Sequence, residues 1–131
     1  MNKIFLDINK SSRLYRLLGD KVSTQFFYAK KDKQIYDSKN IYMGVRDFDS
    51  IYVPAYTDGE LNRILPDKVV ITKKGLRNVF DLVIRKTRTK YIAGYENPAG
   101  TENALIQIPE DSEVEAKASM LFYLFKNNLL K

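Results

Sequence analysis

The densest group of side chains that could do chemistry in this sequence is cationic and lies in one stretch. Residues 68–90 hold eight basic residues against one acid, Asp81, whereas the whole chain of 131 residues has a net charge of +6. Cations that displace counterions from phosphates, beside aromatic rings that can stack on bases, are what single-stranded nucleic-acid binding requires. The candidate nucleic-acid-binding residues are Lys73, Lys74, Arg77, Arg85, Lys86, Arg88, Lys90 and Tyr91.

The densest part of this stretch, Arg85 to Lys90, falls between two segments that alternate like strands, so we expect it to form a hairpin tip with Tyr91 and Tyr95 beside it. The basic residues between 73 and 77 would extend the patch if the preceding turn lies nearby. A structural explanation also stays open, because lysines at hairpin tips keep sheet edges from associating. Codon bias toward lysine would raise the charge as well.

The acidic residues offer a second kind of chemistry, a divalent cation held by oxygen ligands. Asp47 and Asp49 would share one face of a strand, close enough for one cation of a metal-dependent phosphodiesterase. Asp58 and Glu60 are better explained as acids in the first turn of a helix. We therefore predict no metal ion and no cofactor, and keep the phosphodiesterase as an alternative.

The absence of histidine and cysteine from the sequence narrows the function further. Without imidazole no side chain has an ordinary pKa near neutral pH, and without thiol there is neither a soft metal ligand nor a sulfur nucleophile. No Gly-x-Ser-x-Gly elbow and no glycine-rich phosphate loop occurs. We therefore expect a protein that is not an enzyme and that acts through the surfaces it presents.

Length and hydropathy predict a single domain over residues 1–131, in a cytoplasmic protein with no membrane partner. No apolar run approaches the roughly 20 residues that cross a bilayer. The N-terminal segment reaches Asp7 before a signal-peptide core could form. We expect a monomer or a homodimer.

The first half of the chain predicts short elements. Alternation over residues 4–8 indicates a strand, and residues 12–18 have helical spacing, with serine as the N-cap and Gly19 as the C-cap. Residues 24–29 and 34–36 predict a hairpin around a polar turn. Ile41, Tyr42 and Val45 could form one more edge strand.

A proline and a capping box mark the next two elements. Pro54 confines residues 51–56 to an edge strand, since proline cannot donate to a ladder. Thr57 and Glu60 form a capping box that opens a helix of about two turns, and Pro66 closes it.

The second half predicts an antiparallel meander followed by a helix. Strands are expected at residues 69–71, 79–87, 91–95 and 104–108, with Pro109 ending the last. Asp111 or Ser112 caps the C-terminal helix. The fold class is therefore α+β: a mostly antiparallel sheet with two short helices and one long C-terminal helix packed on it.

The C-terminal helix is more apolar than packing on one sheet face requires. Its main stripe runs from Val114 to Leu129, and Met120, Phe122 and Tyr123 widen it. Either the chain itself covers this helix on two sides, or these three residues contact a partner. The tyrosines predicted on strands offer a second partner surface, since tyrosine is enriched in interfaces.

Several short segments resemble a loose family of small proteins of unknown activity encoded by phages and prophages of Bacteroides-type gut bacteria. The resemblance rests on residues 52–57, Glu60-Leu61, Leu65-Pro66, Leu17-Leu18-Gly19, Gly94-Tyr95 and the closing helix from Leu121 to Leu130. It implies a viral origin, an α+β fold, and a role inside the host bacterium or in the virion. It supplies no catalytic residues.

Together these patterns favour a non-enzymatic phage accessory protein that binds a host or phage protein, as in host interaction or counter-defence. Three alternatives remain: a nucleic-acid-binding module using residues 73–95, a structural component of the virion, and the phosphodiesterase centred on Asp47 and Asp49.

Overall fold

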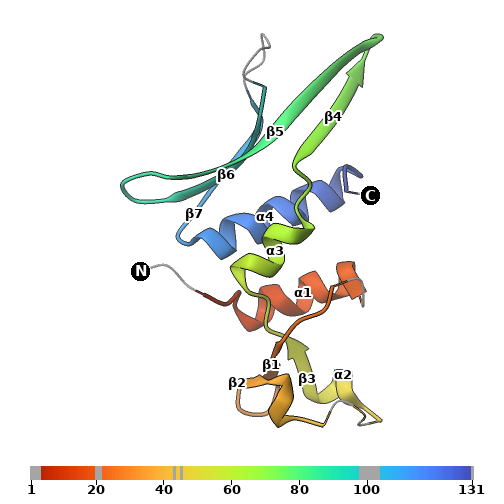
Figure 1. The fold of residues 1–131 in the computed structure, drawn as a ribbon, viewed down its shortest axis with the longest axis vertical. Helices are drawn as coiled ribbons and strands as arrows, with labels where there is room; N and C mark the ends of the chain where they lie inside the picture. The colour runs from red at the N-terminus through yellow and green to blue at the C-terminus, as the bar shows by residue number, and fades with distance from the viewer. Residues whose placement is uncertain (1–3, 20–21, 43, 45, 98–103, 131) are drawn as a thin grey trace.

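The chain forms two antiparallel sheets at opposite ends of an elongated molecule, with helices between them (Figure 1). The computed structural model describes residues 4–19, 22–42, 44, 46–97 and 104–130. The larger sheet has the strand order β4-β5-β6-β7 and the smaller one the order β2-β1-β3. The predicted α+β class is confirmed, with two separate sheets in place of the one expected.

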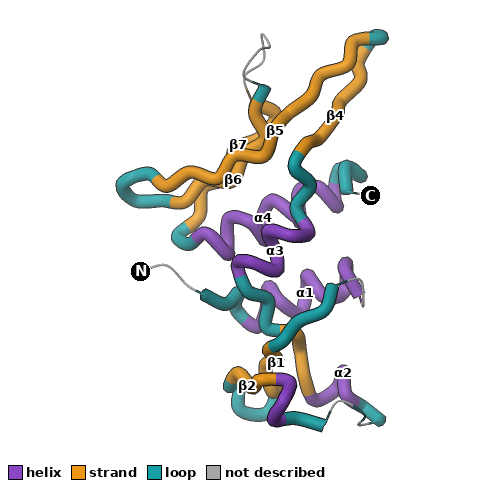
Figure 2. The backbone as a smooth tube through the Cα atoms, in the orientation of Figure 1, coloured by secondary structure: helices purple, strands orange, loops and turns teal. Residues whose placement is uncertain are grey.

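The larger sheet is the predicted meander, in which each strand pairs with its neighbour in sequence. Its strands are β4 (Lys68–Lys73), β5 (Leu76–Lys86), β6 (Tyr91–Glu96) and β7 (Ala104–Glu110). β5 pairs with β4 over residues 76–81 and with β6 over residues 81–86, so that Asp81 belongs to both pairings. The two hairpins that share β5 therefore extend in opposite directions along it (Figure 2).

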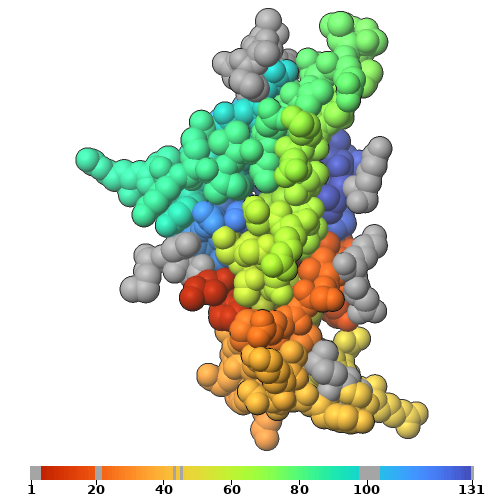
Figure 3. All heavy atoms as spheres, in the orientation of Figure 1, coloured from red at the N-terminus to blue at the C-terminus, as the bar shows by residue number. Residues whose placement is uncertain are grey.

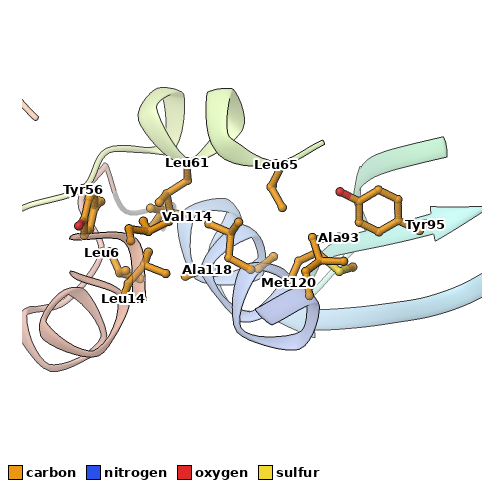
Figure 4. Close-up of a cluster of buried hydrophobic side chains, with 14 of the residues drawn as sticks. Leu6, Leu14, Tyr56, Leu61, Leu65, Ala93, Tyr95, Val114, Ala118 and Met120 are labelled. Atoms are coloured by element: carbon orange, nitrogen blue, oxygen red, sulfur yellow. The ribbon is translucent and has the colours of Figure 1, made fainter. Parts of the chain in front are cut away.

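The long helix α4 (Glu113–Lys126) packs on β6 and β7, and α1 (Ile8–Leu18) and α3 (Asp58–Ile64) pack on α4 in turn. Ser112 is the N-cap, its hydroxyl accepting from the amide of Glu115 at 3.2 Å. Leu61 of α3 and Leu65, the C-cap of this helix, point toward Val114 and Ala118 of α4 (Figure 4). These apolar faces form the main core.

The smaller sheet consists of β1 (Phe26–Ala29), β2 (Ile35–Asp37) and β3 (Tyr52–Pro54), with the short helices η2 (Ser38–Asn40) and α2 (Phe48–Ile51) between β2 and β3. β1 and β2 are the predicted hairpin, and β3 is the predicted edge strand that contains Pro54. A second apolar cluster lies here, and the hydroxyl of Tyr28 joins it to the main core by donating to the Leu6 carbonyl at 2.7 Å.

The N-terminal elements differ from the prediction. The strand expected at residues 4–8 is a single bridge between Phe5 and Thr57, and α1 begins four residues earlier than expected. Asp7 is the cap in place of serine, because its carboxylate accepts from the Lys10 amide at 2.8 Å. Ser11 is instead buried within the first turns of the helix, where its hydroxyl donates to the Leu6 carbonyl.

Two other segments also differ. Ile41 ends η2, and Tyr42 is 75% exposed outside any strand. Val45 lies outside the described residues. Pro109 does not end β7, which continues to Glu110, because β7 is an edge strand that tolerates proline. Over the described residues, none of the helices combines the length and the apolar character needed to cross a membrane.

Candidate nucleic-acid interface

The predicted basic residues divide into two groups at opposite ends of β5. Lys73, Lys74 and Arg77 surround the β4–β5 turn, which we call the first tip; Lys86 and Arg88 lie at the β5–β6 turn, the second tip. β5 has 11 residues, so at about 3.3 Å per residue the two turns are roughly 33 Å apart. The condition for one continuous patch, a nearby preceding turn, is therefore not met: both tips project from the body, in different directions (Figure 3).

The first tip is a two-residue turn. Lys73 pairs with Leu76, and the central residues Lys74 and Gly75 have φ values of 51° and 78°. Positive φ at both central positions is typical of a type I′ turn, which fits the right-handed twist of the strands and favours Asn-Gly. Lys74 thus holds a cation at a position where asparagine is the better local choice. Leu76 beside it is 70% exposed.

The second tip is a turn held by Thr87. The Thr87 amide donates to the Lys90 carbonyl at 2.7 Å, and the Lys90 amide donates to the Thr87 hydroxyl at 3.0 Å. These bonds place Arg88 at the end of the turn. The ammonium of Lys86 lies 5.5 Å from the centre of the Tyr91 ring, within the range of a cation–π contact.

Ion pairs neutralise the basic residues along the sheet between the tips. Lys68 lies 2.6 Å from Asp81, and Arg85 pairs with Glu96. At the base of the second tip Lys90 pairs with Asp111, and this contact raises the pKa of Lys90. Five of the predicted residues have no ion pair with any residue that the structure describes: Lys73, Lys74, Arg77, Lys86 and Arg88.

The predicted stacking rings do not stand open beside the second tip. Tyr95 is fully buried, and its hydroxyl donates to the Pro66 carbonyl at 2.7 Å. Burial raises the pKa of Tyr95, which keeps this donor protonated. Tyr91 is half-buried and packs against the main core. These tyrosines are used for packing because their strand positions face α4.

The predicted partner residues on α4 are largely covered by the chain itself. Met120 is fully buried in the main core, and Phe122 and Tyr123 are half-buried against it. The Arg13 guanidinium lies 4.6 Å from the centre of the Phe122 ring. Because α4 has the sheet on one side and α1 and α3 on the other, its wide apolar surface serves intramolecular packing.

The acidic residues proposed for a metal site are not arranged as expected. Asp47 is the N-cap of α2 and Asp49 lies within this helix, so the two are not alternating strand residues. Positions i and i+2 of a helix do not face each other. The Asp49 carboxylate accepts from the Tyr15 hydroxyl at 3.1 Å. Throughout the described ranges, no three His, Cys, Asp or Glu side chains are grouped to hold a metal ion.

A buried charged group joins α3 to α4, and the sequence analysis missed it. The ammonium of Lys117 lies 3.0 Å from Asp58 and 3.1 Å from Glu113, with its side chain only 5% exposed. Lys10 of α1 pairs with Glu115 in the same way at 3.1 Å. The i,i+4 spacing of Glu113 and Lys117 is a local signal for one of these ion pairs. No local pattern indicates the contact between Asp58 and Lys117, because they are distant in sequence.

The sheet face opposite α4 is a second feature that the sequence analysis did not predict, because it assigned the partner surface of the sheet to the tyrosines. Val79, Val83 and Ile92 alternate with core residues along their strands, so they point to the side of the sheet away from α4. Val70 of β4 points to the same side and is exposed. The uninterrupted apolar runs at 69–71 and 82–84 are the signal that could have found this face, because a strand places alternate residues of such a run on opposite sides of the sheet.

No protein-family model, curated protein or solved structure matches the chain. The resemblance to phage-encoded proteins thus stays a prediction.

Proposed function

We propose that the protein binds nucleic acid through the phosphate backbone, with the first and second tips as its points of contact. The observation that carries this proposal is the distribution of ion pairs. Basic residues along the sheet have acidic partners, whereas the five at the tips have none among the described residues. Unpaired cations on projecting turns are free to displace counterions from phosphates, which is the main source of affinity for nucleic acid.

The comparison with the β1–β2 turn supports this reading. That turn carries three lysines, Lys30, Lys31 and Lys33, and Lys33 has a positive φ of 59°. Asp32 lies between Lys31 and Lys33 and accepts from the Tyr36 hydroxyl at 2.6 Å. If the lysines served only to keep turns hydrated, an acidic residue beside the lysines would be as acceptable at the two tips as it is in the β1–β2 turn. Neither tip contains an acidic residue.

The position of the tyrosines favours contact with phosphates over stacking on bases. With Tyr95 buried and Tyr91 packed on the core, neither tip offers the open ring that binds an unstacked base. Binding should therefore depend strongly on salt and weakly on sequence.

The test compares three variants that each lose two cations: Lys74→Asn with Arg77→Thr at the first tip, Lys86→Thr with Arg88→Ser at the second, and Lys31→Ser with Lys33→Asn as the control. Each phosphate neutralised contributes about 0.9 to the slope of log affinity against log salt. We expect a slope of about −4 for wild type, and a loss of up to about two units in either tip variant.

Fluorescence anisotropy with labelled DNA between 50 and 200 mM salt measures these slopes. The control should keep the wild-type affinity and slope, because its lysines lie on the smaller sheet at the far end of the molecule (Figure 1). Equal losses in the control and the tip variants, or wild-type affinity that does not respond to salt, would contradict the proposal.

A second candidate function is the binding of a host or phage protein, as expected for a phage accessory protein. The observation in its favour is the valine-bearing sheet face, where Val70, Val79, Val83 and Ile92 lie opposite α4. An interface built on this face should respond little to salt. Purification from infected cells with and without nuclease distinguishes the two functions, and detection in purified particles would instead favour a structural role in the virion.

A further inference from the structure

We propose that the ligand is a B-form duplex longer than one helical turn, held by both tips at once along β5. This inference rests on the proposed function and deepens it by naming the class of nucleic acid. It starts from the length of one strand. The turns at the two ends of β5 are about 33 Å apart, at 3.3 Å per residue, and one turn of B-form DNA advances by about 34–36 Å.

A duplex lying along β5 would present equivalent parts of its backbone to both tips, because the helix repeats after one turn. Lys74 and Arg77 would contact phosphates at one crossing, and Lys86 and Arg88 would contact phosphates at the next. A shorter duplex can reach one tip only.

The spacing of the tips is set before binding. Both turns belong to the same strand, and β5 is hydrogen-bonded to β4 or β6 from Leu76 to Lys86. The first turn closes directly on the Lys73–Leu76 pair, and the second is held by the bonds between Thr87 and Lys90. Fixing two contacts in advance lowers the entropy lost on binding.

The charge of the sheet between the tips fits the same arrangement. Asp81 and Glu96 neutralise Lys68 and Arg85, and Glu96 also accepts from the Gln107 amide at 3.1 Å. Between two crossings of one strand a full turn apart, a duplex faces the protein with its two grooves and a single crossing of the other strand. Most of this span is groove, so the middle of β5 needs fewer unpaired cations than the tips, whereas a flexible single strand would gain from a continuous positive track.

If both tips contact one duplex, the affinity should rise sharply once the duplex is long enough to reach both tips; we call this rise the step. Once both tips are engaged, the second contact forms within the complex at a high effective concentration. We expect wild type to bind a 16-base-pair DNA duplex at least about tenfold more tightly than a 7-base-pair duplex, after correction for the number of equivalent sites. Extension from 16 to 24 base pairs should add only that statistical factor.

The experiment measures anisotropy at 50 mM salt with 7-, 16- and 24-base-pair DNA duplexes, each closed by a loop so that it stays paired, and with a 16-nucleotide single strand. Wild type and the Lys31→Ser/Lys33→Asn control should show the step and should prefer the 16-base-pair duplex to the single strand. Either tip variant should bind the 7- and 16-base-pair duplexes with nearly equal affinity after the same statistical correction, because only one tip remains to contact the DNA.

Two outcomes overturn the inference, and they are distinguishable. If wild type binds DNA with salt dependence but without the step, or if a tip variant retains the step, the two-tip duplex is wrong while the proposed function stands. If no DNA binds even at 50 mM salt, the proposed function fails as well.

Discussion

At the scale of single residues, Lys74 places a cation at a backbone position that disfavours lysine. A side chain with a Cβ is disfavoured at positive φ, and asparagine tolerates this region better than lysine. Lys74→Asn should therefore keep the turn intact while it removes the charge, which makes any loss of binding a direct measure of the cation. Lys33 has the same backbone conformation, so Lys33→Asn is a control for the backbone effect as well as for the charge.

The buried ion pairs of Lys117 with Asp58 and Glu113 are the second feature at this scale, because each of them depends on one side chain. Because Lys117 contacts both Asp58 and Glu113, loss of its ammonium would leave two carboxylates facing each other with only partial access to water. A hydrogen bond with Asp58, together with partial burial, raises the pKa of Glu113 above its ordinary 4.5, and Lys117 opposes this only in part.

A carboxyl whose pKa is higher in the folded state than in the unfolded state stabilises the fold below its unfolded pKa, and this contribution is lost as pH rises through the folded pKa. Relative to Glu113→Gln, we therefore expect the free energy of unfolding of wild type to fall as pH rises from about 4.5 through the raised pKa. Urea unfolding of both proteins at a series of pH values measures the difference.

Asp32 provides a control of opposite sign. Its hydrogen bond from Tyr36 lowers the pKa of Asp32, so its stabilising contribution is present above the unfolded value of 3.8 and is lost as pH falls through the folded pKa. Relative to Asp32→Asn, wild type should lose stability toward acid. Identical pH profiles for wild type and Glu113→Gln would show that the Asp58–Glu113 contact does not exist in solution.

At the scale of elements, α3 depends on its capping box because it has only seven residues. The Thr57 hydroxyl accepts from the Glu60 amide at 3.3 Å, and the Glu60 carboxylate accepts from the Thr57 amide at 2.9 Å. We expect Thr57→Ala to lower the free energy of unfolding by about 1 kcal/mol, measured by urea denaturation.

Thr57→Ser is the matched control, since serine keeps the hydroxyl acceptor and should cost only a few tenths of a kcal/mol. An equal loss in both variants would mean that the threonine methyl, and not the cap, stabilises this end of α3.

At the scale of the whole molecule, the described residues form two apolar clusters of unequal size, and this difference should appear in the dynamics. The cluster of the smaller sheet has three buried residues, Tyr28, Val53 and Ala55, whereas the main core includes residues of the helices α1, α3 and α4. Regions with few buried contacts open at lower free energy than the centre of a core. We expect amides of β1 to exchange with solvent at least about tenfold faster than those of Ala93 and Tyr95 in β6.

Val53→Ala separates local from global opening. It should accelerate exchange in β1 and β3 and leave β6 nearly unchanged, as followed by hydrogen exchange with mass spectrometry or NMR. If exchange accelerates equally in both sheets, the chain unfolds as one cooperative unit, in agreement with the single domain expected from the sequence.

Much of the fold at the scale of elements could be predicted from local signals. The capping box at Thr57, the hairpin of β1 and β2, the meander and the C-terminal helix all follow from caps, turns and periodicity, which act over a few residues. Errors occurred where local signals compete: Asp7 and the serines can each cap α1, and Pro109 can end a strand or lie on an edge strand.

The sequence by itself determined most of the helices and strands, that the chain is α+β, and that its cations are densest between residues 68 and 90. Only the tertiary structure decided that β5 pairs with β4 along one half and with β6 along the other, which separates those cations into two tips. It also decided that Arg85 and Lys90 find acidic partners and that Met120 and Tyr95 are buried. The physical reason is that φ, ψ and periodicity are set by neighbours in sequence, whereas strand register, ion pairing and burial depend on segments brought together by packing.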